Sequence, residues 1–230
     1  WEYRYLKNLL VRERGIESSV MLLSADRDFA QEGNAPISRL PRNAAEFAPF
    51  DLVILGDVPA GALSQTQMEA IREMVSKRGA GLLWIAGSRA MPRSWKGSGL
   101  EEVLPLRGSL ELERHDEAVT MRPTTRADRL GLLRISRDAD ETWPPELASA
   151  ASGWSRLEWA QRIQGSDLKP TAEVIAETAS GDGGVAMPLL VSMRYGAGQA
   201  MYLATDETWR WRYGRGETLP ERFWLQLLRH

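Results

Sequence analysis

The chain has 230 residues, of which 43% are hydrophobic and 26% charged, and its formal net charge is −2. This composition is typical of a globular protein with a real core, and it provides no basic excess for nucleic acid, so we expect no nucleic-acid partner. Cysteine is absent and there are only two histidines, His115 and His230. Thiol catalysis and disulfides are excluded, and we expect no metal and no cofactor. No stretch approaches the roughly 20 apolar residues of a membrane-spanning helix, so we expect this fragment not to be membrane-embedded.

The first half of the chain alternates between predicted helices and strands. The chain opens as a helix with Leu6, Leu9 and Leu10 on one face, and we expect a domain excised from a longer protein because natural chains rarely begin inside a helix. Ser64 and Gln67 form a capping box for a second helix. Apolar runs predict buried strands at 19–24, 50–57 and 81–87.

The second half is less regular. We interpret residues 100–165 as an insertion packed over the sheet by large aromatic side chains, with a strand at 110–121 and a short helix or turn at 130–135. Antiparallel strands are then predicted at 171–178, 188–195 and 199–205, joined by turns at 180–184 and 196–198. A capping box from Thr218 to Glu221 starts the last helix.

Together these elements predict one α/β domain spanning residues 1–230. Continuous apolar strands separated by helices favour a mainly parallel sheet that is covered on both faces. We therefore expect a flavodoxin-like three-layer sandwich with an irregular insertion and antiparallel strands at the C-terminal end.

Two segments resemble class I glutamine amidotransferase-like domains: residues 51–57, a strand ending in Gly-Asp, and residues 81–89, where that family places its nucleophile elbow. The catalytic cysteine of the family falls at Ala86, or at Ser88 if the alignment shifts by two. The place of the family's His-Pro-Glu has no histidine here. The resemblance thus implies the fold without the chemistry, and we expect no catalytic residues.

Five further segments resemble modules of this degenerate type in uncharacterised bacterial proteins, which are similar to the extracytoplasmic parts of membrane-anchored proteins. The resemblance implies a periplasmic location and other protein domains as partners. It also implies a strand ahead of the opening helix, which this chain lacks, so we expect an irregular sheet there, filled by another segment or by a second copy in a homodimer. The five segments are residues 1–4, 54–58, 195–198, 206–212 and 222–226.

Candidate ligand-binding residues follow the predicted strands, at the edge where sheets of this class bind ligands. If residues 206–212 are extended, Arg210 and Arg212 lie on one face and can bind a carboxylate or phosphate through paired hydrogen bonds. Alternatively, the tryptophans pack under the insertion and the arginines pair with nearby carboxylates. The candidates are Asp57, Ser88, Arg89, Asp206, Glu207, Arg210 and Arg212.

Two weaker motifs are more simply explained. Ser88 lacks both the second glycine of a Gly-x-Ser-x-Gly elbow and a histidine base, which argues against a serine hydrolase. Asp26, Asp28, Glu32 and Asn34 resemble half a calcium loop, but the glycine falls at the wrong spacing and no terminal glutamate follows, so we interpret this segment as a solvated acidic loop.

Three functions remain open from the sequence. The favoured one is a non-catalytic module for protein interaction or sensing within a larger envelope-anchored protein. The alternative is a small-ligand domain that holds an anionic or sugar-like molecule in the old active-site pocket. A third is an enzyme using Asp206 and Glu207 as acid and base, although adjacent residues on a strand point to opposite faces.

Overall fold

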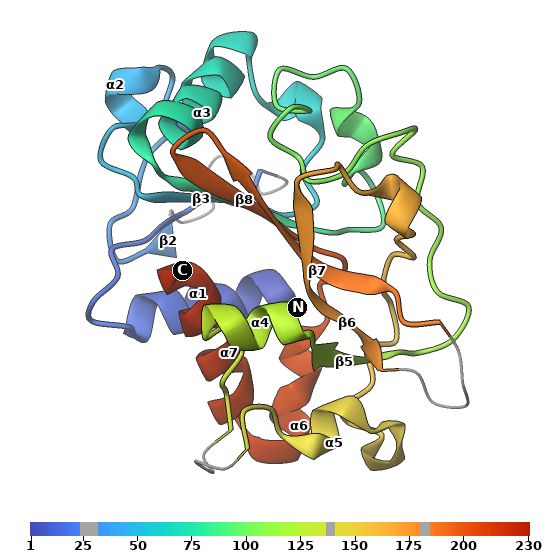
Figure 1. Cartoon of the computed structure of the whole chain (residues 1–230). Helices are drawn as coiled ribbons and strands as arrows, with labels where there is room; N and C mark the ends of the chain where they lie inside the picture. Colours follow the sequence, from blue (N-terminus) through green and yellow to red (C-terminus); the bar gives the residue numbers. More distant parts are fainter. Residues whose placement is uncertain (24–31, 137–140, 180–184) are drawn as a thin grey trace.

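The computed structural model describes residues 1–23, 32–136, 141–179 and 185–230. Its centre is a six-stranded sheet in the order β3-β4-β8-β7-β6-β5 (Figure 1). β4 pairs in parallel with both β3 and β8, and all remaining pairs are antiparallel, so β8 joins a parallel half to an antiparallel half. The strands are β3 (Leu52–Leu55), β4 (Gly81–Ile85), β5 (Thr120–Pro123), β6 (Ala172–Ala179), β7 (Pro188–Tyr195) and β8 (Gly198–Leu203).

Helices lie on both sides of this sheet. α2 and α3 lie on one side and α1, α4 and α7 on the other (Figure 1), which confirms the predicted α/β three-layer fold. The helices are α1 (Glu2–Arg12), α2 (Ala44–Phe47), α3 (Gln65–Arg78), α4 (Thr125–Leu130), α5 (Pro145–Ala148), α6 (Arg212–Arg215) and α7 (Thr218–Arg229). Short 3₁₀ turns are η1 (Ala60–Ala62), η2 (Arg93–Trp95), η3 (Ala150–Ser152), η4 (Gly165–Asp167) and η5 (Thr208–Trp211).

α3 shows how the sequence specifies one of these elements. The hydroxyl of Ser64 accepts from the Gln67 N–H at 3.3 Å, and the Ser64 N–H donates to the Gln67 side chain at 2.9 Å. The helix ends at Gly79, whose left-handed conformation (φ 79°) suits a residue without a Cβ. Both ends were predicted, and the apolar face between them is buried.

The β7–β8 hairpin fits closely against the end of α3. Gly196 and Ala197 form its turn, and the Ala197 N–H donates to the Ser76 carbonyl at 2.8 Å. A Cβ at Gly196 would lie 2.3 Å from that same carbonyl oxygen. Only glycine therefore allows the hairpin to approach the helix this closely, which confirms the turn predicted at 196–198.

The strand predicted at 19–24 is wrong as far as the described residues reach. β1 (Ser19–Val20) pairs antiparallel with β2 (Glu32–Gly33) in a separate two-stranded sheet. Leu22 and Leu23 are 39% and 41% exposed rather than buried. β3 consequently forms the edge of the main sheet, with no partner on its outer side among the described strands. The acidic positions Asp26 and Asp28 lie outside the described residues.

Two other predicted elements are also corrected. Of the strand predicted at 110–121, only its end enters β5, and the rest contributes isolated bridges at Arg114 and Val119. α7 begins at Thr218 with Glu217 as its N-cap and no side-chain cap bond, so the last capping box does not form. The turn predicted at 180–184 lies outside the described residues. Within residues 100–165, the Trp143 ring meets Trp211 edge-on at 5.8 Å, and residues 120–123 join the main sheet as β5.

Candidate functional site

The carboxyl ends of β3, β4 and β8 meet at one edge of the sheet. Asp57 follows β3, Ser88 and Arg89 follow β4, and Asp206 follows β8. A hollow of about 380 Å³ lies beyond β4; it is lined by the turn 87–93 together with residues 110–112, 114, 159 and 161. We call it the β4 hollow. Its position matches the usual ligand site of open α/β sheets.

Asp57 holds the turn that forms one wall of this hollow. Its carboxylate accepts the backbone N–H groups of Arg89, Ala90 and Met91 at 2.9, 2.7 and 2.9 Å. A Cβ at Gly87 would lie 2.0 Å from the Asp57 Cγ, so glycine is required where the two segments cross. The three converging N–H groups form a small anion-binding nest whose anion is supplied by the protein itself. Asp57 therefore fixes the turn and does not line the hollow.

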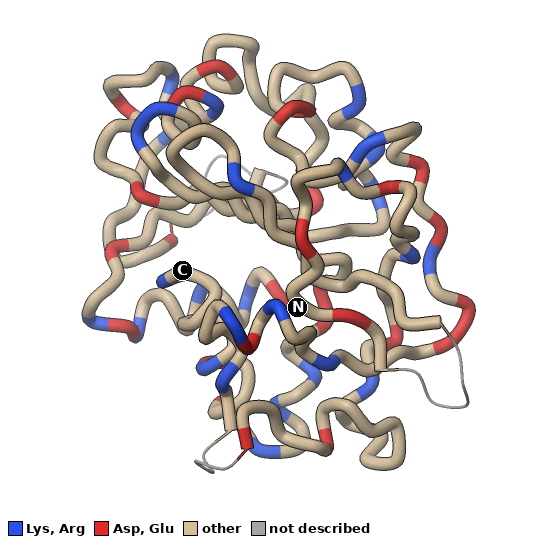
Figure 2. The backbone as a smooth tube through the Cα atoms, viewed as in Figure 1, with Lys and Arg blue, Asp and Glu red and all other residues tan. Residues whose placement is uncertain are grey.

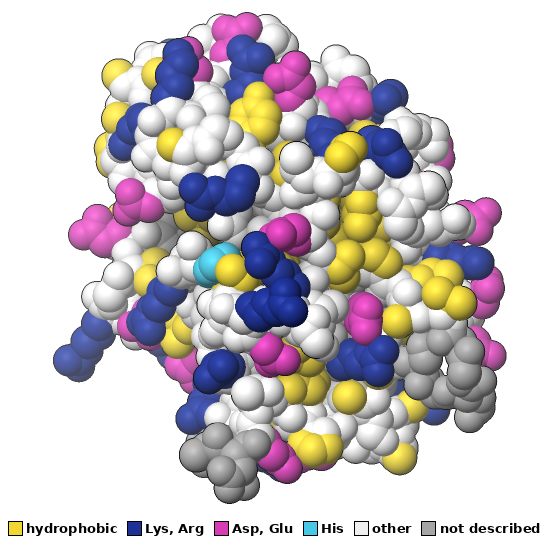
Figure 3. Space-filling view, viewed as in Figure 1, with side chains coloured by type: hydrophobic (Ala, Val, Ile, Leu, Met, Phe, Trp, Pro, Cys, Tyr) yellow, Lys and Arg dark blue, Asp and Glu magenta, His cyan; other side chains and the backbone are white. Residues whose placement is uncertain are grey.

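The rim of the β4 hollow carries an excess of positive charge. Arg89, Arg93 and Arg114 line it together with one carboxylate, Glu111. Arg93 lies 3.9 Å from Glu111, whereas the side chains of Arg89 and Arg114 make no hydrogen bond or ion pair with any described residue. This excess is local, because basic and acidic positions mix along the backbone and on the face drawn in space-filling form (Figures 2 and 3).

The floor of the hollow is a buried polar network. Gln161 is 5% exposed, and its amide donates to the Met91 carbonyl at 2.7 Å. The hydroxyl of Tyr202, on β8, donates to the Gln161 carbonyl oxygen. Burial, and then the charge of Asp57, raise the pKa of Tyr202 well above its usual range, so this hydroxyl stays a neutral donor. The network ties the hollow to the centre of the sheet.

The carboxylates after β8 have structural contacts. Glu207 accepts the Trp159 N–H at 2.9 Å, and its Oε2 lies 3.2 Å from the Arg210 Nε. That nitrogen is buried without a hydrogen bond, so the contact is an ion pair and not a well-aligned hydrogen bond. Burial, and then the charges of Glu207 and Asp57, raise the pKa of Asp206. Neither Asp206 nor Glu207 lines the hollow.

The extended conformation considered for residues 206–212 is wrong. Thr208–Trp211 form the 3₁₀ turn η5, and Arg212 begins α6. Arg210 lies over the Trp209 ring at 5.3 Å, while Arg212 lies over Tyr5 at 4.0 Å and pairs with Glu217. The two arginines therefore do not form a shared anion site. Of the seven candidate residues, only Ser88 and Arg89 line the β4 hollow.

Glu2 is a buried acidic group that the sequence analysis missed. It is 3% exposed and accepts from the Thr208 hydroxyl at 2.8 Å, the Trp224 indole at 3.1 Å and the Trp209 N–H at 3.3 Å. Burial raises its pKa to about 7, although these hydrogen bonds act in the opposite direction. The signal was present, since helical spacing places Glu2 on the same face as Leu6.

The β4 hollow holds no activated nucleophile. The Ser88 hydroxyl has no hydrogen bond to any base among the described residues, and the sequence contains no cysteine. His115 does not line the hollow, and burial lowers its pKa. Within the described ranges, no cluster of three or more His, Asp or Glu side chains could hold a metal ion.

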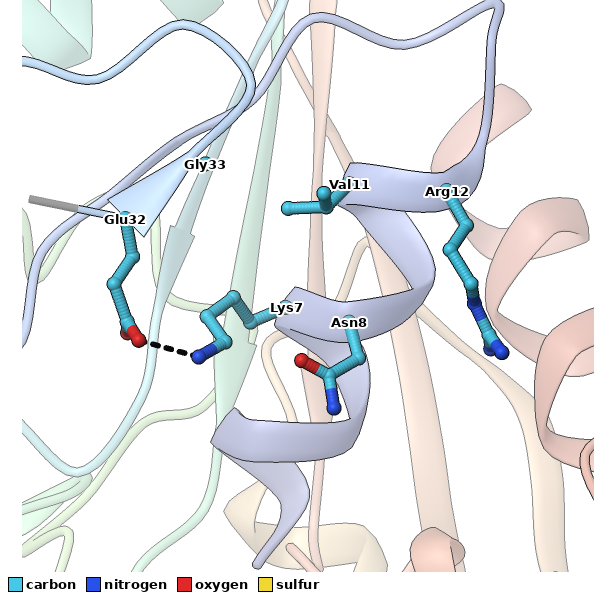
Figure 4. Close-up of a pocket in the computed structure, with 6 residues that line it drawn as sticks. All are labelled: Lys7, Asn8, Val11, Arg12, Glu32 and Gly33. Carbon is cyan, nitrogen blue, oxygen red and sulfur yellow. Dashed lines mark hydrogen bonds and ion pairs between the residues drawn. The ribbon is translucent and has the colours of Figure 1, made fainter.

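A second hollow, of about 450 Å³, lies between α1 and β2 (Figure 4). Lys7 points across it and pairs with Glu32, which also accepts the Tyr3 hydroxyl. These contacts lower the pKa of Glu32. Arg12 points away from Glu32 and lies 3.8 Å from Glu217. Because its charges already have partners, this hollow is a weaker candidate than the one beyond β4.

No protein-family model and no curated protein matches this sequence. Among solved structures, a cytoplasmic protein of Salmonella typhimurium LT2 is similar, with 20% identity and a TM-score of 0.55 over 83% of this chain and 76% of that one. A second cytoplasmic protein of Salmonella typhimurium has 16% identity and a TM-score of 0.59 over 83% and 75% of the two chains. At this identity the similarity concerns the fold alone. The resemblance to amidotransferase-like domains stays a prediction.

These comparisons correct the predicted location. The resemblance implied a periplasmic, membrane-anchored protein, whereas both similar structures belong to proteins described as cytoplasmic. In the ranges that the structure describes, no helix has the length and apolar character needed to cross a membrane. The two cytoplasmic proteins contradict the periplasmic, membrane-anchored prediction, which is not retained.

Proposed function

We propose that this chain is a non-catalytic domain that binds a small ligand in the β4 hollow. One observation carries the proposal: the hollow lies at the carboxyl edge of the parallel strands, and its rim offers two arginines whose side chains have no partner among the described residues. The buried Gln161–Tyr202 network and the turn held by Asp57 support it, because a wall ordered in advance lowers the entropic cost of binding.

A ligand panel on the purified chain tests this function. Amino acids, sugars, nucleotides and small anions are added in turn, and the thermal midpoint is recorded. A ligand at 100 times its Kd stabilises the native state by about 2.7 kcal/mol. We expect at least one compound to raise the midpoint.

A blocking variant locates the site. Ser88→Trp places a large ring at the mouth of the hollow, whereas Ser38→Trp places the same ring at an exposed position away from it. The ligand shift should disappear in the first variant and persist in the second. If a folded wild type responds to no compound, the small-ligand function is rejected.

Protein interaction is a second candidate with its own observation. Trp1 and Tyr213 are 66% and 68% exposed, and Tyr5 and Trp209 stack between them with ring centroids 6.1 Å apart. Exposed aromatic surface is enriched at protein–protein contacts. Self-association, including the predicted homodimer, is measured by sedimentation of the wild type beside Tyr213→Ser. A mass that falls in the variant supports this candidate, and a monomeric wild type removes the homodimer.

A further inference from the structure

The hollow beyond β4 has features that decide which class of ligand it takes, provided that it binds a ligand at all. The sequence left both a neutral sugar and an anion as possible ligands. The charge of the rim, the ion pairs of its side chains and the anchoring of its backbone distinguish between these two classes.

The local charge of the rim is opposite to that of the whole chain. Three arginines and one glutamate line the hollow, although the chain has a formal net charge of −2. The Arg93–Glu111 pair, at 3.9 Å, is neutral as a unit. Arg89 and Arg114 remain, so the rim has two positive charges that no carboxylate within the described ranges pairs with. Two uncompensated cations on one rim make the hollow locally positive, which favours an anion there.

Exposed arginines without an ion pair also occur elsewhere among the described residues, as at Arg14 and Arg129, so what distinguishes Arg89 and Arg114 is that both line one hollow. Arg39, Arg122 and Arg126 each pair with a glutamate within 3 Å. Arg89 and Arg114 are exposed and form no such pair with described residues. Guanidinium groups bind carboxylates and phosphates through two parallel hydrogen bonds, so a free pair at a hollow is suited to such groups.

Both arginines are anchored at their backbones. The N–H of Arg89 is held by Asp57 at 2.9 Å, and Arg114 forms a β-bridge with Gln161 in the floor of the hollow. Only the side chains must be ordered when a ligand binds, which reduces the entropic cost. Asp57 does not compete for the ligand position, because its carboxylate is fully used by the turn.

We propose that the ligand of the β4 hollow carries a carboxylate or phosphate group and that Arg89 and Arg114 bind this group. This inference rests on the proposed function and narrows it to anionic small molecules. A neutral sugar can accept hydrogen bonds from these guanidinium groups but has no opposite charge, whereas a contact with an anionic group strengthens binding about 10- to 100-fold for each arginine.

Matched pairs of probes test the inference. Glucose 6-phosphate is compared with glucose, and glutarate with 1,5-pentanediol, by titration calorimetry on the whole chain. We expect the charged member of at least one pair to bind and its neutral partner not to bind. The affinity of the charged member should fall as salt rises, because ions screen the contact.

The variants separate this site from general charge effects. Arg89→Ala/Arg114→Ala should weaken binding of the charged probe at least about 10-fold. Arg14→Ala/Arg129→Ala removes the same charge at exposed positions with no partner among the described residues, and it should bind like the wild type. Equal loss in both double variants overturns the inference, because the effect is then one of net charge.

The failure of this inference is distinct from the failure of the proposed function. If glucose or pentanediol binds as well as its charged partner, the ligand-binding function stands and the anionic class is wrong. If no probe binds and the broader panel also gives no shift, both are overturned.

Discussion

Two carboxyl groups each accept three hydrogen bonds in different surroundings: Asp57 follows β3 and holds the turn after β4, and Glu2 lies at the junction of α1 with η5 and α7. Asp57 is half-buried and receives three backbone N–H groups. Glu2 is fully buried and receives a hydroxyl, an indole and one backbone N–H, with no ion pair among the described residues. Burial raises the pKa of Glu2 to about 7. Hydrogen bonds alone thus do not keep a buried carboxyl group charged, since they must outweigh its loss of solvent.

The largest expected effect comes from removing the Asp57 carboxylate. Asp57→Ala leaves three N–H groups of the turn without their acceptor, so the free energy of unfolding should fall by about 4 kcal/mol. Urea denaturation measures this loss. Asp57→Asn, which keeps one acceptor oxygen, should lose less.

Chemical rescue provides the control for this prediction. Acetate or formate can enter the vacated nest in Asp57→Ala and should restore part of the lost stability, while the wild type should not respond. A variant as stable as the wild type, or one that acetate does not help, would contradict the role of Asp57 as an internal anion.

The second prediction concerns the pH dependence that Glu2 imposes. Its folded pKa of about 7 is above its ordinary value of 4.5, so the native state binds the proton more tightly than the unfolded state. The contribution of Glu2 to stability is complete below the unfolded pKa and is lost as pH rises through 7. The total loss is about 3 kcal/mol.

Glu2→Gln isolates this effect because the amide does not titrate. Urea unfolding is measured at about pH 5 and about pH 8. As pH rises between these values, the free energy of unfolding of the wild type should fall by about 2 kcal/mol relative to that of the variant. A constant difference between the two proteins at both pH values would show that Glu2 has the same pKa in the folded and unfolded states, which contradicts the prediction.

The smallest expected effect concerns Arg212, which also attaches α1. Its guanidinium lies over Tyr5 at 4.0 Å and pairs with Glu217 at the surface. Arg212→Ala should cost about 1 kcal/mol and leave binding in the β4 hollow unchanged. If Arg212→Ala lowers the free energy of unfolding more than a Glu2 variant does, then Arg212, and not the buried carboxyl group, contributes most to the stability of the junction between α1, η5 and α7.

The sequence predicted the elements whose local signals and tertiary surroundings agree. Three local signals each predicted the element that the structure contains. They are the capping box of Ser64, the turn at Gly196 and the apolar runs of β3 and β4. The run at 19–24 is equally apolar, but its leucines remain partly exposed beside a two-residue strand. An apolar run indicates a strand only where a neighbouring strand is present to pair with it.

The sequence predicted the edge of the sheet where the hollow lies, but only some of the residues that line it. Counting strand ends placed Ser88 and Arg89 at the hollow. Arg114 could not be found this way, because it reaches the site through a single bridge from an irregular segment. The alternation Trp209-Arg210-Trp211-Arg212 favours a strand by its period of two, yet the segment forms a 3₁₀ turn in which Trp211 is buried against Trp143 and Phe223.

The position of β8 between the two halves of the sheet has a consequence for the order of folding. Its pairing with β7 closes through a short turn, and hairpins of this kind form within about 1–10 microseconds. Its pairing with β4 joins Gly81 to Gln199 and requires a much longer loop to close first. We expect mutations in the hairpin to slow folding and mutations in β3 to speed unfolding, so that the edge carrying the β4 hollow is assembled last.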